Sequence, residues 1–518
     1  MGCNASKSGK SDVVVPPQIV PQSPSIAPSE YQSEATGIPE TLYSNAELSD
    51  AENEEEREQL DAAMTGMMAK LEDVLKQARE RIDFGDFMTA EQRLMAFLHE
   101  VEVSEDPMVV RHKAVVKLRH SFEYKATLKA LKVLESLAEE ILGQGSEEAG
   151  PWKAGTVIPV DYPAIGFPLD KDASPIILPH HDKVKTFYRL NGKQLDIRVD
   201  FLLPSKTPTV MPTVAGLIAM WFEMEAWHTW HPVLVGPSPV ECWSKRSYHN
   251  LFHIPQKFFR RNMSELVEHK IYLLEESGIF MQSMEGKPAD DPLWKQYPAP
   301  GSCKPIPGAV KSGLFCLCQK DVSVVSILSE AKLEYALPEF VIKFVISWLL
   351  PEIVKGQIKA GANCFTAGGP HFSAMEKDAM GVYDHIRRVA QRGTDLDATG
   401  RGLFTPDNMP KPDVVKNRHN NLLKFHHEAS KGTLTGPLAD VVKYHHEHHV
   451  HSSEGGVVSA AEDARPMESS GTHEERSELL IDEGRFLAGL ARDKKIQPAV
   501  QLEDRANAAC CGSGFSCI

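Results

Sequence analysis

The sequence predicts an α+β fold, in which a small all-helical module precedes an antiparallel sheet and a long final helix, with disordered segments at both ends. Three observations predict it. Apolar residues recur every three or four positions between 57 and 145. Strand-like runs separated by turn residues follow between about 186 and 328. The segment 336–350 is apolar apart from one narrow polar stripe, which is typical of a helix covering an apolar surface.

Composition excludes several classes of protein. The formal net charge of -15 argues against a nucleic-acid-binding surface, because phosphate recognition needs a basic face. Nine cysteines in 518 residues are too few and too scattered for a disulfide framework. No run of about eighteen uncharged apolar residues is present, so nothing is expected to span a bilayer. We therefore expect a cytoplasmic chain.

Residues 1–56 read as an acylated, disordered tether. Gly2 follows the initiator Met and Ser6 occupies the sixth position, as N-myristoylation requires, and Cys3 is placed for palmitoylation. One myristoyl chain binds membranes only marginally, whereas two acyl chains make a stable anchor. The sequence predicts peripheral attachment to the cytosolic face of the plasma membrane or an endomembrane. The Pro-, Ser- and Glu-rich stretch that follows is typical of a flexible linker.

Residues 57–145 are predicted to form helical hairpins. The first apolar stripe consists of Leu60, Met64, Met67, Leu71, Val74, Ala78 and Ile82. The turn at 84–87 resembles the loop of a tetratricopeptide hairpin, which would make the module a site for a protein partner. A plain packing bundle and a coiled-coil dimer through the first helix remain alternatives.

Residues 152–365 contain the predicted sheet. Asn191-Gly192 marks a hairpin, and a helix over 212–225 ends near Trp227, Trp230 and Pro232. Further strands are expected at 238–244, 265–275, 278–285, 313–319 and 322–328, before the final helix that opens at Leu337-Pro338.

This order of elements, with the Trp227, Trp230, Pro232 motif and the Leu337-Pro338 helix start, resembles the START family of steroidogenic acute regulatory protein-related lipid transfer domains. The resemblance covers about 152–362. It implies a helix-grip fold, in which a curved antiparallel sheet wraps the long C-terminal helix and encloses a cavity for one hydrophobic lipid, a sterol or a phospholipid.

Five aromatic side chains are the candidate ligand contacts, in the cavity or on its lid. Phe340, Phe344 and Trp348 lie four residues apart on one face of the final helix, and Trp227 and Trp230 close the earlier one. The alternative is that they pack an ordinary core.

No catalytic set, metal site or cofactor motif is predicted. Scattered histidines match no ligand spacing, Cys316 and Cys318 read as buried thiols on one strand face, and the His-rich segment 445–451 lacks a scaffold. An enzyme of the helix-grip superfamily, a cyclase or hydrolase using the same cavity, is the rival interpretation.

Residues 366–518 are predicted to be a mostly disordered tail, with short helices near 375–392 and 476–492. Cys510 and Cys511 near its end are candidate palmitoylation sites. Taken together, the sequence predicts a non-enzymatic, membrane-anchored lipid sensor or carrier. A membrane-tethered adaptor that recruits proteins through its helical module is the second hypothesis.

Overall fold

The computed structural model describes most of the chain between residues 54 and 444: 54–143, 150–161, 183–204, 213–234, 238–244, 249–258, 261–320, 322–332, 338–363, 371–378, 381–402 and 404–444. All of these residues belong to one compact unit, Met1–Val450, and the second unit is His451–Ile518. The predicted acylation sites Gly2, Cys3, Cys510 and Cys511 lie outside the described residues.

Four helices begin the described chain: α1 (Glu54–Asp83), α2 (Phe87–Val103), α3 (Met108–His120) and α4 (Phe122–Leu142). The predicted stripe on α1 is confirmed, since Met67, Leu71, Ala78 and Ile82 are buried. Helix α2 begins at Asp86, whose carboxylate accepts a hydrogen bond from the backbone N–H of Thr89.

Eleven described strands form one sheet in the order β1-β3-β4-β11-β10-β8-β7-β6-β5, with β2 on β3 and β9 on β7. Their bounds are β1 (Lys153–Ala154), β2 (Ile158–Pro159), β3 (Lys183–Asn191), β4 (Gln194–Pro204), β5 (Ser238–Ser244), β6 (His249–Phe258), β7 (Arg261–Leu274), β8 (Ile279–Gly286), β9 (Lys304–Pro305), β10 (Val310–Leu317) and β11 (Val322–Lys332). The β3–β4 hairpin turns at Gly192, whose φ of 59° is the left-handed conformation that favours glycine.

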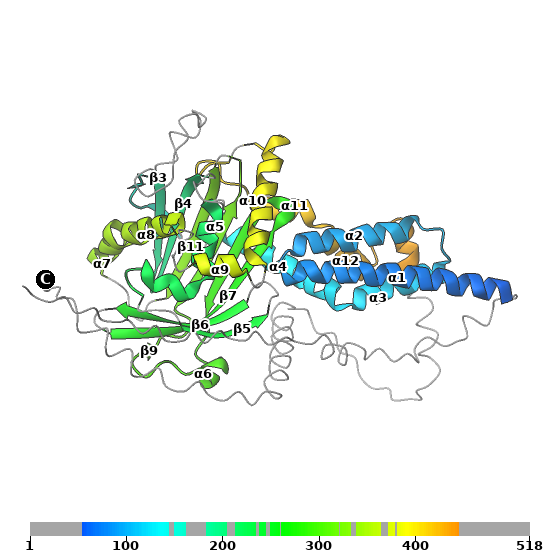
Figure 1. Ribbon diagram of the computed structural model, residues 1–518, viewed down its shortest axis with the longest axis horizontal. Coiled ribbons are helices and arrows are strands. Elements are labelled where there is room, and N and C mark those ends of the chain that lie inside the picture. The colour runs from blue at the N-terminus through cyan, green and yellow to red at the C-terminus, as the bar shows by residue number, and fades with distance from the viewer. Residues whose placement is uncertain are drawn as a thin grey trace, which may run out of the picture. The chain divides into compact units, whose positions relative to one another are not determined.

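Side chains alternate across the strands, so the sheet has two buried faces. We call the face that carries Phe201, Leu314 and Val325 the inner face. It packs against α5 (Thr213–Phe222), the 3₁₀ turn η5 (Met224–Thr229), α10 (Val382–Ala398) and the continuous helix α7 (Glu339–Phe344), η8 (Val345–Leu349) and α8 (Leu350–Asn363), which we call the grip helix. Figure 1 shows α5 and α8 on the same side of the sheet. This arrangement confirms the predicted α+β helix-grip class.

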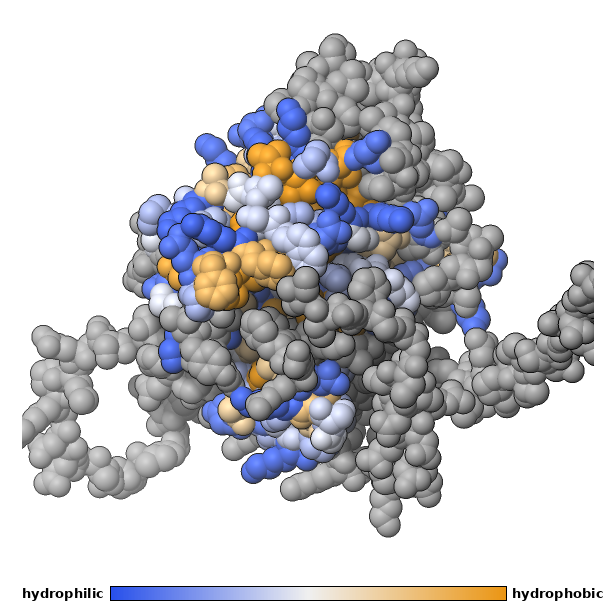
Figure 2. Space-filling view, turned by 90° about the vertical axis from the view of Figure 1, so that its left-hand side faces the viewer, coloured by the Kyte–Doolittle hydropathy of each residue, from blue (hydrophilic) through white to orange (hydrophobic). Residues whose placement is uncertain are grey.

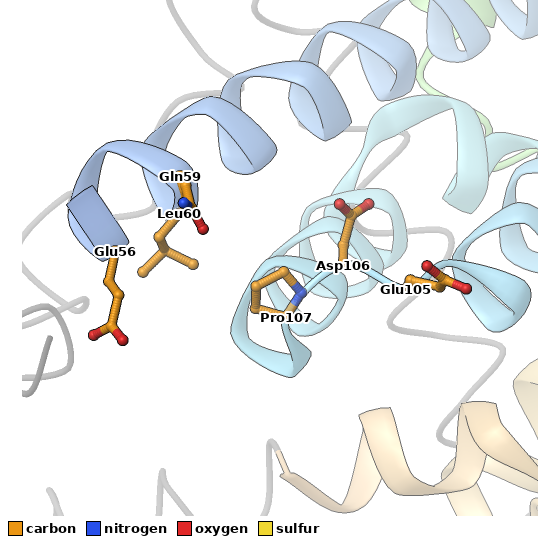
Figure 3. Close-up of a pocket in the computed structure, with 6 residues that line it drawn as sticks. All are labelled: Glu56, Gln59, Leu60, Glu105, Asp106 and Pro107. Carbon is orange, nitrogen blue, oxygen red and sulfur yellow. The ribbon is translucent and has the colours of Figure 1, made fainter.

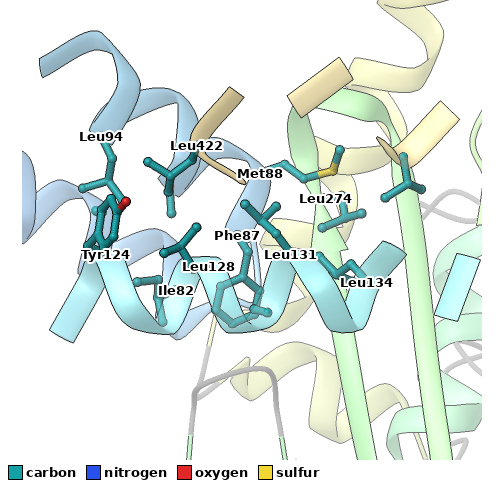
Figure 4. Packing of buried hydrophobic residues seen from close by; sticks show 14 of the residues in the cluster. Ile82, Phe87, Met88, Leu94, Tyr124, Leu128, Leu131, Leu134, Leu274 and Leu422 are labelled. Atoms are coloured by element: carbon teal, nitrogen blue, oxygen red, sulfur yellow. The ribbon is translucent and has the colours of Figure 1, made fainter. Parts of the chain in front are cut away.

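The outer face, which carries Leu202, Phe315 and Val324, packs against the four-helix module. Helix α4 lies closest, since residues of β10 and β11 contact it. Figure 4 shows the resulting joint core, in which Leu274 of the sheet lies among the helical residues Phe87, Met88 and Leu134. The helical module therefore shares its core with the sheet.

The predicted short helix near 375–392 is confirmed, but the prediction of disorder is wrong for the described residues after it, up to 444. The described residues between 371 and 444 contain α9 (Phe372–Lys377), α10, α11 (Asp413–His419) and α12 (Asn421–Lys431). Its apolar residues are sparse, but Leu422 and Phe425 enter the core of the helical module and Ile386 and Val389 enter the inner core. The short apolar stripes gave a weak local signal, and burial against distant elements stabilises these helices.

None of the helices that the structure describes is both long enough and apolar enough to cross a bilayer.

Candidate functional site

The inner core under the grip helix is the candidate site. The grip helix buries one residue every four positions, at Ile342, Ile346, Leu350, Val354 and Ile358. Opposite them, Phe201, Phe280 and Leu314 are at most 1% exposed. The described side chains therefore fill the middle of the inner face, and apolar side chains that are only half-buried, including Tyr188, Ile197 and Val310, lie at its rim.

The grip helix widens into a π-helix over Val345–Leu349, where the Leu350 N–H donates to the carbonyl of Val345, five residues back. Pro351 follows directly. Proline has no N–H, and its ring clashes with the carbonyl four residues earlier, which is that of Ser347. A wider turn relieves this clash, so the sequence itself explains the local departure from α-helix.

The outward side of the grip helix is apolar as well. Phe340, Phe344 and Trp348 are 73%, 52% and 58% exposed. The rings of Phe344 and Trp348 stack, with centroids 5.0 Å apart and planes at 26°. These three residues do not line the inner core, so the cavity part of their predicted role is wrong in this structure, and the lid part stays a prediction. Figure 2, which faces the side where α7 lies in Figure 1, shows apolar side chains at that surface.

The two predicted tryptophans lie elsewhere on the inner core. Trp227 is 4% exposed, and its indole N–H donates to the carbonyl of Met220. Its ring packs edge-on against Trp221 at 5.0 Å and lies 6.0 Å from Trp230. The buried indole N–H groups of Trp221 and Trp230 have no acceptor among the described residues. Trp227 therefore packs within the inner core and the Trp230 carbonyl lies against Gly356 of the grip helix, whereas the aromatic row is exposed on the outward side of that helix.

A polar row that the sequence did not predict crosses the inner face. It consists of Asn250 on β6, His269 on β7 and Gln282 on β8, which are 7%, 0% and 1% exposed. The signal was present on β7, where His269 alternates into the same face as Val267 and Ile271. Alternation alone could not show that this polar position would be covered.

Glu265 lies on the same face of β7, near one end of the row's strands. Burial raises the pKa of its carboxyl to about 8, even though the N–H of Val310 donates to Oε1 at 2.7 Å. Oε2 has no partner among the described residues. At neutral pH this side chain is therefore mostly uncharged.

A second polar cluster joins three parts of the chain. Asp86, Glu275 and His385 bring their possible metal-ligating atoms within 4.8 Å of one another. However, Arg81 donates to Oε2 of Glu275 at 2.9 Å and Arg388 donates to it at 3.2 Å. Neighbouring His385 and Arg388 lower the pKa of Glu275 to about 2. Two guanidinium groups on one carboxylate repel a dication, so this cluster acts as an ionic joint between α1, the β7–β8 turn and α10.

The remaining candidates do not form a reactive site. Cys316 and Cys318 are buried thiols on the inner face, as predicted, and burial raises the pKa of Cys316. Figure 3 shows a surface hollow of about 540 Å³ between the first turns of α1 and the α2–α3 connection. Its lining includes Glu56, Glu105 and Asp106, so it suits no apolar ligand. The predicted His-rich segment 445–451 lies outside the described residues.

Comparison with known proteins gives similarities in structure only. No protein-family model matches the chain, and no curated protein matches its sequence. Among solved structures, a STAR-related lipid transfer protein fragment from Xanthomonas axonopodis is 12% identical, with a TM-score of 0.28, and the match covers 38% of this chain and 98% of that one. Human STARD10 is 11% identical, with a TM-score of 0.30 and coverages of 44% and 90%. Human StAR-related lipid transfer protein 5 is 13% identical, with a TM-score of 0.27 and coverages of 45% and 96%. TM-scores this low do not by themselves assign a family.

Proposed function

We propose that this protein binds one lipid molecule between the inner face of its sheet and the grip helix, and that it takes up or delivers the lipid at a membrane surface. The observation that carries the proposal is that the grip helix is apolar on both sides. Ile342 and Ile346 face the inner core, while Phe340, Phe344 and Trp348 face outward.

An apolar outward side has a physical consequence. Three large aromatic side chains exposed to water in one row are unfavourable unless a partner covers them. Aromatic rings are favoured at the boundary between water and hydrocarbon, where an amphipathic helix lies in the plane of the interface. A bilayer is the partner that also supplies the ligand.

Lipid entry requires the grip helix to move, because the described side chains fill the middle of the inner face. The π-helical turn before Pro351 interrupts regular α-helical hydrogen bonding and divides the helix into α7 and α8. A helix divided in this way has a natural bending point. Insertion of the aromatic row into a bilayer would pull α7 away from the sheet and expose the inner core to the lipid phase.

Acylation at Gly2 and Cys3 remains part of the proposal, with Cys510 and Cys511 as further candidates. The anchor would hold the chain at a cytosolic membrane face, so that the aromatic row samples the bilayer at high effective concentration.

A vesicle sedimentation experiment tests the membrane contact. The full chain with Gly2→Ala, which removes the predicted acyl anchor, is compared with the same chain carrying Phe340→Ser, Phe344→Ser and Trp348→Ser. We expect the triple substitution to reduce binding to phosphatidylcholine vesicles by tenfold or more without lowering the melting temperature, because the lost area is not buried in the fold. The matched control is Val103→Ser, Phe122→Ser and Val133→Ser, which alters exposed apolar residues of the helical module.

Equal loss with the control triple, or no loss with the aromatic triple, would contradict the membrane contact.

Mass spectrometry of lipid extracted from the purified full chain tests the ligand itself. One lipid of defined class per protein is the expected result.

The adaptor is the second candidate, and one observation favours it. Side chains in the middle of the inner face, such as Phe201 and Phe280, are 0% exposed, as in an ordinary packed core. A chain that yields no stoichiometric lipid from cells or vesicles, but still sediments with vesicles through its aromatic row, would support the adaptor over the lipid carrier.

A further inference from the structure

The polar row on the inner face indicates which class of lipid would fit. Asn250 lies directly opposite His269 in the β6–β7 pairing, and Gln282 pairs with Ile271, two residues along from His269. Side chains directly opposite or diagonal on one sheet face are within reach of each other. The row therefore forms a continuous polar strip on the inner face.

The strip carries an unused hydrogen-bond acceptor. Oε1 of Gln282 is buried and has no partner among the described residues. Burial of such a group without a partner costs about 1–3 kcal/mol. A ligand that brings a donor, a hydroxyl or an amide N–H, would recover this energy.

No described Lys or Arg side chain of β6, β7 or β8 lies on the inner face beside the strip. The exposed Lys153 on β1 and Lys304 on β9 lie opposite the inner-face residues Tyr188 and Met263, away from the strip. Lys and Arg of β3, β4, β7, β10 and β11 alternate onto the outer face, at Lys185, Arg189, Arg198, Lys270, Lys311 and Lys332. Asp196 and Asp200 pair with the two arginines there. A phosphate buried at the strip would have no adjacent Lys or Arg from these strands as a counter-charge, which is a prohibitive cost in an apolar interior.

We propose that Asn250, His269 and Gln282 recognise the polar group of an uncharged lipid that carries a hydrogen-bond donor, such as a sterol, a diacylglycerol or a ceramide, and that the site discriminates against phospholipids. This inference rests on the proposed lipid-binding function and selects between the sterol and phospholipid alternatives. Because the row is closed to solvent, the ligand reaches it only after the covering helices separate from the sheet.

The test measures lipid uptake by the full chain from phosphatidylcholine vesicles that contain a radiolabelled tracer. The tracers are cholesterol, diacylglycerol, ceramide, phosphatidylserine and phosphatidylcholine itself. We expect at least one of the three uncharged tracers to be bound tenfold or more above both phospholipids. If cholesterol is the bound tracer, its methyl ether, which lacks the donor, should be bound several-fold less.

Gln282→Leu tests the acceptor. It should reduce uptake of the preferred lipid by about tenfold, the effect of one hydrogen bond to a buried partner, and leave the melting temperature unchanged or higher. Met281→Leu is the matched control, because Met281 lies on the same strand but on the outer face, directly opposite Tyr272. It should leave uptake unchanged.

The outcomes distinguish failure of this inference from failure of the proposed lipid-binding function. The inference is overturned, and lipid binding is left intact, if phospholipid uptake equals or exceeds the uptake of every uncharged tracer. Unchanged uptake of the preferred lipid by Gln282→Leu has the same meaning. Absence of uptake for all five tracers overturns both.

Discussion

At the residue scale, Asp86 joins the first helical hairpin to the rest of the molecule. Its side chain is fully buried, and Thr89 donates to it from both the backbone N–H and the hydroxyl. Burial raises its pKa to about 7, while the Thr89 hydrogen bonds and Arg81 oppose the shift and Glu275 adds to it. When the pKa of a carboxyl group is higher in the folded than in the unfolded state, the folded protein becomes less stable as pH rises from the unfolded-state pKa to the folded-state pKa.

We therefore predict that Asp86→Asn gains stability relative to the natural chain as pH rises. Between pH 5 and 8 the difference in free energy of unfolding should change by roughly 2–3 kcal/mol in favour of the variant, because tenfold in a protonation equilibrium is worth about 1.4 kcal/mol. Urea unfolding of both proteins at pH 5, 6, 7 and 8 measures it. A difference that does not vary with pH would contradict the assignment.

Arg198 and Asp200 form a buried ion pair on the outer face of the sheet. The Arg198 Nε donates to both Asp200 oxygens at 3.0 and 2.9 Å, and its Nη1 donates to the carbonyl of Ile141 in α4 at 2.9 Å. Ser326 donates to Asp200 at 2.6 Å. This network connects α4 to the sheet.

Arg198→Met should destabilise the fold by about 3–5 kcal/mol, because it leaves the Asp200 charge buried without a cation. The double variant with Asp200→Asn should be less destabilised than the single one. Lys70→Met, which breaks an exposed pair with Glu100, should leave the stability nearly unchanged. Equal losses for single and double variants in urea unfolding would refute this reading.

At the scale of elements, α10 depends on a close approach to the sheet. A Cβ on Gly393 would lie 2.4 Å from the carbonyl oxygen of Cys318, and a Cβ on Gly278 would lie 2.6 Å from Gly393. The helix therefore packs with its backbone against the strand ends, which only glycine permits.

Gly393→Ala should lower stability by about 1–3 kcal/mol through overpacking. Gly66→Ala is the matched helical control, since no atom lies within 4 Å of its added Cβ, and it should be stabilising by about 0.5–1 kcal/mol. Thermal unfolding followed by circular dichroism compares the two. A neutral Gly393→Ala would mean that α10 can shift away from the sheet without loss.

At the scale of the whole molecule, the C-terminal helices complete the core of the N-terminal module. The Leu422 N–H donates to Oε1 of Glu91 at 2.8 Å, and Phe425 packs in the same core. Burial raises the pKa of Glu91 to about 7, and the backbone donors at Leu422 and Asn421 partly offset the shift.

A chain ending at residue 450 should melt at the same temperature as the full chain, because it keeps every described element. A chain ending at residue 402 should melt roughly 5 °C lower or more, because it exposes the apolar core under α12 and removes the donors to Glu91. Differential scanning calorimetry of the three chains measures this. Equal melting temperatures for the two truncated chains would show that the C-terminal helices add no stability.

The sequence by itself determined the local elements, because period and turn chemistry are local properties. The stripe on α1, the Gly192 hairpin, the strand at Ser238–Ser244 and the buried thiols at 316 and 318 agree with the structure. The strand β6 escaped prediction, and the final helix proved longer than expected and contains a π-helical turn before Pro351. Which face of each element would be covered was not a local property.

The tertiary structure alone decided that coverage. It turned Phe340, Phe344 and Trp348 outward, buried the polar row on the inner face, and folded residues 413–431 back onto a module more than three hundred positions earlier. The physical reason is that burial depends on contacts between segments far apart in the chain, and these contacts, rather than the periodicity of any one segment, fix which side of a helix or strand meets water.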